Sequence, residues 1–123
     1  MGMISFSDKS EETWSVAGWA FRQILDDVIS QHPEDLEIIE SFDRAVDYSG
    51  LSIDLLNPEL ALRVSEAIWQ VATDILAGKI RTGLHDKPYG DAATIEQYRE
   101  GLQCLLESFP ASWKDEENRS FLN

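Results

Sequence analysis

Apolar residues recur at helical spacing over four segments of the chain. They predict helices over residues 10–30, 34–48, 58–80 and 92–109. In each segment the apolar positions lie three or four residues apart and gather on one side, while polar and mostly acidic residues occupy the other. We therefore expect an all-α fold, a compact bundle of about four helices.

Capping residues mark the ends of these helices. Asn57 and Asp91 stand at N-cap positions of the third and fourth helices, and Gly50 follows the second helix where a C-cap is expected. Asp8 and Glu11 have the spacing of a capping box ahead of the first helix. These signals predict four separate helices joined by short connections.

The third helix is expected to be central, because apolar residues cover more than half of its circumference. One stripe runs from Leu60 to Ile75. A second stripe lies beside it and contains Leu62, Trp69, Ala72 and Leu76. A helix with two such stripes packs against several neighbours at once. The second stripe also suits the interface of a homodimer, which is an alternative role for it.

Two short segments have the alternating pattern of strands. Residues 4–6 and 51–55 alternate apolar and polar side chains, so a small two-stranded pairing is a minor addition to the bundle. The chain as a whole, residues 1–123, is predicted to form one domain with peripheral ends at 1–9 and 110–123. Trp113 and Phe121 are expected to dock the C-terminal end onto the bundle.

The composition combines a normal core with a strongly acidic exterior. The 123 residues carry a formal net charge of −13, with 23 Asp and Glu against 10 Lys and Arg, yet 43% of them are hydrophobic. That apolar content is too high for a disordered acidic chain. The charge repels nucleic acid and anionic membranes, so we expect neither as a partner and expect a basic protein instead.

The remaining composition indicates a cytoplasmic protein. Cys104 is the only cysteine, which excludes an internal disulfide and fits a reducing compartment. The N-terminal residues lack the basic and long apolar segments of a signal peptide, and no apolar run is long enough to span a bilayer. No motif indicates a catalytic residue, a metal site or a cofactor, so we expect a binding protein rather than an enzyme.

The densest acidic region falls on the second predicted helix and its N-terminal connection. Its carboxylates lie three or four residues apart on one face, and like charges this close together reduce stability unless something offsets them. The candidate partner-binding residues are Glu34, Glu37, Glu40, Asp43 and Asp47. Trp19 projects away from the apolar stripe of the first helix and is a candidate anchor for the same partner. Immunity proteins, which neutralise basic nuclease toxins, are the functional class that best suits these properties.

The segment 79–91 is the one stretch of net positive charge. Its candidate ligand-binding residues are Lys79, Arg81, His85, Lys87 and Tyr89. Basic side chains and free backbone N–H groups ahead of the fourth helix suit an anion. The first alternative function is therefore a small domain that binds an anionic small molecule, or hydrolyses it, through this segment. The second alternative is a structural homodimer.

Overall fold

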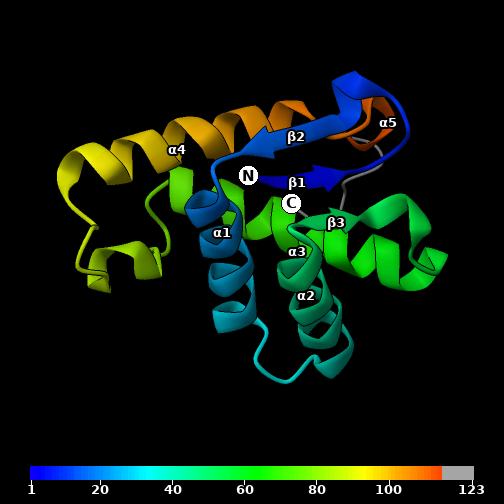
Figure 1. The fold of residues 1–123 in the computed structure, drawn as a ribbon, viewed down its shortest axis with the longest axis horizontal. Helices are drawn as coiled ribbons and strands as arrows, with labels where there is room; N and C mark the ends of the chain where they lie inside the picture. Colours follow the sequence, from blue (N-terminus) through cyan, green and yellow to red (C-terminus); the bar gives the residue numbers. More distant parts are fainter. Residues whose placement is uncertain (115–123) are drawn as a thin grey trace.

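A three-stranded mixed sheet lies beside the helices (Figure 1). The computed structural model describes residues 1–114. Its strands are β1 (Gly2–Ser5), β2 (Thr13–Val16) and β3 (Gly50–Ser52), in the spatial order β2-β1-β3. β1 runs antiparallel to β2 and parallel to β3. The prediction of an all-α fold is therefore wrong: the fold is mostly helical but combines helices with a sheet.

The helices account for most of the described chain. They are α1 (Gly18–Gln31), α2 (Leu36–Tyr48), α3 (Pro58–Leu76), α4 (Ala92–Glu107) and the short α5 (Ala111–Lys114). Single 3-10 turns occur at η1 (Ser10–Glu12), η2 (Ile53–Leu55) and η3 (Gly83–Asp86). α1 and α2 lie side by side and run across α3, which also packs against α4 (Figure 1). The predicted central place of the third helix is confirmed.

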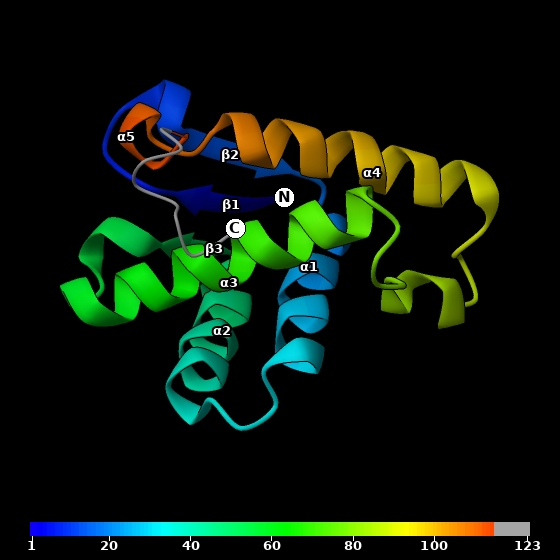
Figure 2. The ribbon, with the colours of Figure 1, turned by 180° about the vertical axis from the view of Figure 1, so that it is seen from behind.

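The sheet exists because one apolar side chain from each strand faces the core. Ile4 pairs with Trp14 on one side and with Leu51 on the other, and all three are buried. Met3 and Ser15, one residue along, face solvent. Seen from behind, α3 and α4 cross in front of the sheet (Figure 2). One face of the sheet therefore closes the core and the other is exposed.

The first helix begins later than its periodicity predicts. Residues 10–16 form η1 and β2, and the N-cap of α1 is Ala17, so no capping box forms at Asp8 and Glu11. Trp14 fits either pattern, because it is apolar at both the helical and the strand period. Its pairing with Ile4, and the hydrogen bond of 3.0 Å from its Nε1 to the Gly101 carbonyl of α4, favour the strand.

The other helix ends follow local capping chemistry. The Asn57 side chain accepts a hydrogen bond from the Leu60 N–H, and that of Asp91 accepts one from the Thr94 N–H, as predicted. α2 ends through Ser49, whose φ of 55° is left-handed, so Gly50 is free to begin β3. α3 ends at Leu76 rather than near residue 80, because Gly78 takes a left-handed φ of 76°.

The second apolar stripe of α3 is largely covered within one copy of the chain. Ala72 is fully buried and Trp69 nearly so, with the Trp69 ring 4.8 Å from that of Phe109. Trp113 is half-buried and packs against the same cluster, whereas Phe121 lies outside the described residues. Leu62 remains half exposed. The stripe thus offers little apolar surface to a second copy.

The tight contact between β1 and α1 gives a test of this packing. A Cβ atom at Gly2 would lie 2.2 Å from both Cβ and Cγ of the buried Phe21. Gly2→Ala is therefore expected to lower the free energy of unfolding by about 2 kcal/mol, the usual cost of overpacking. Chemical denaturation measures the change.

Gly18→Ala provides the matched control. A Cβ atom at Gly18, the first residue of α1, would meet only the Met1 backbone nitrogen, at 3.9 Å. Alanine also favours the helix. Equal destabilisation by the two substitutions would contradict the packing described for β1 against α1.

Candidate functional site

The solvent-facing half of α2 carries most of the predicted partner-binding residues. Ile38, Phe42 and Ala45 bury the other half against the core. The exposed residues are Leu36, Glu37, Glu40, Asp43, Arg44, Asp47 and Tyr48, and we call them the α2 face. The structure therefore places Glu37, Glu40, Asp43 and Asp47 together, on a helix at one edge of the molecule (Figure 1).

The carboxylates at the N-terminal end of α2 are compensated by the fold. The Asp35 side chain caps the helix by accepting from the Ile38 N–H at 3.2 Å. Arg63 of α3 lies 3.0 Å from Asp35 and 3.1 Å from Glu37. The hydrogen bonds that Arg63 donates to Glu37 raise the pKa of its guanidinium most; desolvation lowers that pKa, and the hydrogen bond donated to Asp35 raises it further. These carboxylates help to hold α2 on α3.

Two carboxylates toward the C-terminal end of α2, those of Asp43 and Asp47, have no such compensation in the described part of the chain. Glu40 pairs with Arg44 at 2.8 Å, but within residues 1–114 no ion pair reaches Asp43 or Asp47. Asp43 and Asp47 are one helical turn apart, so their charges repel. Asp47 also lies in the last turn, where the helix dipole disfavours a negative charge and no basic residue is present.

Two of the predicted partner-binding residues, Glu34 and Trp19, are not part of the α2 face. Glu34 is exposed in the connection from α1 to α2, next to the N-cap Asp35. Trp19 is half-buried in the first turn of α1, and its ring lies 6.3 Å from that of Tyr98 on α4. It lines a hollow with Tyr89, Thr94 and Gln97. The structure groups Trp19 with α4 rather than with α2.

Tyr48 is the aromatic residue that the α2 face does carry. It is 83% exposed at the last position of α2, beside Asp47. The sequence contained one signal for this exposed position. At helical spacing, Tyr48 falls on the acidic side of the helix and not on the apolar side with Ala45 and Val46. Tyrosine is one of the residue types enriched among the side chains that contribute most to binding in protein interfaces.

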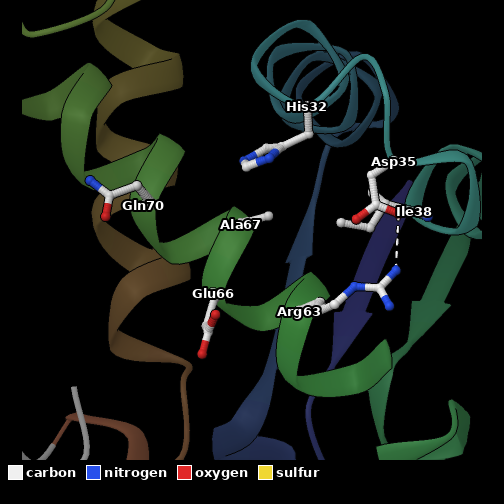
Figure 3. A pocket seen from close by; sticks show the side chains of 7 residues that line it. All are labelled: His32, Asp35, Ile38, Arg63, Glu66, Ala67 and Gln70. Atoms are coloured by element: carbon white, nitrogen blue, oxygen red, sulfur yellow. Dashed lines mark hydrogen bonds and ion pairs between the residues drawn. The ribbon is translucent and has the colours of Figure 1, made fainter. Parts of the chain in front are cut away.

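A pocket of about 290 Å³ opens between the start of α2 and α3 (Figure 3). It is lined by His32, Asp35, Ile38, Arg63, Glu66, Ala67 and Gln70. The His32 imidazole points toward Ala67, while the Glu66 carboxylate points away from the pocket (Figure 3). Within the described part of the chain, no group of three or more His, Cys, Asp or Glu residues is placed to hold a metal ion.

A buried carboxylate fastens the basic segment 79–91 to the helices. Asp27 of α1 is 5% exposed and accepts four hydrogen bonds. The donors are the Thr82 hydroxyl, the Gly83 N–H at 2.9 Å, the Tyr98 hydroxyl at 2.8 Å and the Gln23 amide at 3.1 Å. We call these five residues the Asp27 network. A buried carboxylate is tolerated only when it is satisfied in this way.

The Asp27 network also acts on the tyrosine it contains. Burial, followed by the adjacent Asp27 charge and its hydrogen bond, raises the pKa of Tyr98 well above its ordinary value. The sequence carries no signal that joins Asp27, Thr82 and Tyr98, because they lie far apart in the chain and each falls on an ordinary helix or loop position.

The network divides the predicted ligand-binding residues into two groups. Lys79, Arg81 and His85 line one pocket, together with Arg99 of α4. Tyr89 lies on the other side, in the hollow beside Trp19. Lys87 lines neither pocket. It lies close enough to Asp26 of α1 to oppose the rise in the pKa of that carboxyl group, which burial causes and the Asp27 charge increases. Segment 79–91 is therefore not a single site.

Comparisons with known proteins found no match to this chain among protein-family models, curated proteins or solved structures. None of the helices in residues 1–114 has both the length and the apolar character needed to cross a bilayer.

Removal of one donor tests the Asp27 network. Tyr98→Phe deletes a hydrogen bond to a buried carboxylate, so it is expected to lower the free energy of unfolding by about 1.5–3 kcal/mol at neutral pH. Tyr89→Phe, which changes a half-exposed ring outside the network, is the control and is expected to change little. Equal effects would contradict the role assigned to the Tyr98 hydroxyl.

The raised pKa of Tyr98 predicts how its contribution depends on pH. Below the ordinary tyrosine value of 10.0 the hydroxyl is protonated in both the folded and unfolded states, so its stabilising effect is complete. Above that pH the unfolded state loses the proton first. The stability difference between wild type and Tyr98→Phe should therefore stay constant up to that pH and decline beyond it, which denaturation at a series of pH values measures.

Proposed function

We propose that this protein binds a basic protein partner through the α2 face, without catalysing a reaction on it. The observation that carries this proposal is the uncompensated pair Asp43 and Asp47 beside the exposed Tyr48. These carboxylates reduce the stability of their own helix. A binding role gives a reason for their position that folding does not.

The α2 face combines long-range attraction with a short-range anchor. Its carboxylates, in a chain of net charge −13, attract a basic surface from a distance and speed the encounter. Tyr48 then supplies a large side chain with a hydroxyl, suited to a pocket on the partner. Leu36, 74% exposed at the other end of α2, adds a second apolar contact.

The compensated carboxylates have a different role in this proposal. Glu37 pairs with Arg63 and Glu40 with Arg44, so the conformations of both side chains are restricted before a partner arrives. Preorganised groups lose less conformational freedom on binding. A partner of this class is a protein whose binding surface is rich in Lys and Arg. Inhibition of a basic enzyme, as immunity proteins do, is the form of this function that we propose.

Charge reversal on the α2 face tests the proposal. The double variant Asp43→Lys/Asp47→Lys is expected to lose at least tenfold in affinity for a basic partner, since each reversed charge replaces attraction with repulsion. The wild-type interaction is expected to weaken steeply as salt increases. Capture from lysate of the native cell at low salt, followed by titration of the captured protein, measures both effects.

The matched control reverses a similar pair on another helix. Glu96→Lys/Glu100→Lys changes the net charge by the same amount, at two exposed positions one turn apart on α4. This control is expected to retain the proteins captured by the wild type. Equal loss in both double variants would show only a general effect of net charge and would overturn the assignment to the α2 face.

Tyr48→Ala separates the anchor from the charge. The change leaves every charge in place and removes an exposed ring, so stability should be unaffected while affinity falls about tenfold. Tyr89→Ala is the control at the other exposed tyrosine. Unchanged affinity in Tyr48→Ala would remove Tyr48 from the proposed site.

A further inference from the structure

A second pocket, of about 370 Å³, lies between the C-terminal end of α3 and α4. Nine residues line it, among them Lys79, Arg81, His85 and Arg99. Its size is within the range of small-molecule sites. The turn at Gly78, the segment after it and η3 form one wall, and Ile95 and Arg99 of α4 form the other.

The charge of this pocket is opposite to that of the molecule. Three of the ten Lys and Arg residues in the chain line it, and a histidine joins them, but none of its nine lining residues is acidic. The pockets at the start of α2 both contain carboxylates. Arg81 forms an ion pair of 3.1 Å with Asp86, and both of these side chains are largely exposed. Asp86 offsets the charge of Arg81, but no ion pair within residues 1–114 reaches Lys79 or Arg99, so the pocket keeps a net positive charge in an acidic protein.

Two of its polar residues are held in place by the fold. Arg99 donates to the Ile75 carbonyl at 3.0 Å and to the Leu76 carbonyl at 3.1 Å, at the end of α3. These bonds use two of the five N–H donors of its guanidinium. Thr82 is fixed by Asp27. A cation that is already immobilised loses little freedom when an anion binds.

The apolar part of the lining narrows the class of ligand. Ile75, Ile80 and Ile95 supply aliphatic surface, and none of the nine lining residues is Phe, Tyr or Trp. A nucleobase would find only the small, exposed imidazole of His85 on which to stack. A carboxylate matches the planar fork of an arginine side chain. The lining is thus complementary to an aliphatic chain that ends in a carboxylate.

We propose that this pocket binds a small organic anion consisting of a carboxylate on a short aliphatic chain. Lys79, Arg81 and Arg99 meet the carboxylate, and the three isoleucines meet the chain. This site involves none of the α2 face residues, so it can exist whether or not α2 binds a partner.

Hexanoate is the probe for this proposal, and backbone amide NMR shifts measure its binding. It is expected to produce saturable shifts in residues 78–86 and 95–99, with a Kd of about 1 mM, as suits so small a ligand. Acetate, which lacks the chain, and hexanol, which lacks the charge, are each expected to bind at least tenfold more weakly. Inorganic phosphate tests whether any anion is enough.

Substitutions at exposed positions assign the contacts. Lys79→Gln/Arg81→Gln is expected to raise the Kd for hexanoate about tenfold. Lys87→Gln, on the same segment but outside the pocket lining, is the matched control and should leave the Kd unchanged. Ile95→Ala is expected to reduce the preference for hexanoate over acetate.

Several results would overturn the proposal. These are the absence of saturable shifts, shifts centred elsewhere in the molecule, equal binding of hexanoate, acetate and phosphate, or equal effects of the Lys79/Arg81 and Lys87 variants. Because the α2 variants leave this pocket intact, a failure here is distinguishable from a failure of the proposed partner binding.

Discussion

The fold depends on the hydrogen bonds that satisfy one buried carboxylate, that of Asp27. It is the only acidic side chain buried among residues 1–114. A charge in the interior is costly unless hydrogen-bond donors surround it. Asp27 obtains four, from α1 itself, from the segment after α3 and from α4. The single carboxylate thus joins three parts of the chain that share no local sequence signal, and it fixes where the basic segment lies.

This arrangement separates the charges of the molecule into two surfaces. The Asp27 network holds Thr82 at the lining of the basic pocket, and Arg99 adds a cation from α4. The α2 face lies on a different helix and keeps its carboxylates exposed. At the start of α2, Asp35 stabilises the helix by capping it and by pairing with Arg63. Asp43 and Asp47 form no such contacts within residues 1–114. The two proposed sites therefore rest on different residues and opposite charges.

Local signals predicted the helices well and the sheet poorly. Asn57 and Asp91 identified two helix starts, because an N-cap is a contact within one turn. β2 was missed because Trp14 suits both periods and its partners, Ile4 and Gly101, are distant in sequence. For the same reason the sequence grouped Lys79 with Lys87, which the structure separates, and did not reveal Arg99. Contacts between distant residues carry no periodic signature.

If Asp43 and Asp47 of α2 serve a partner rather than the fold, as we propose, their charges are not needed for stability. The most direct measurement is the free energy of unfolding of Asp43→Asn/Asp47→Asn at low salt, compared with wild type. Removal of two charges that repel each other and oppose the helix dipole predicts a stability equal to or above that of the wild type. A loss of about 1 kcal/mol or more would show that these carboxylates stabilise the fold and would contradict the account.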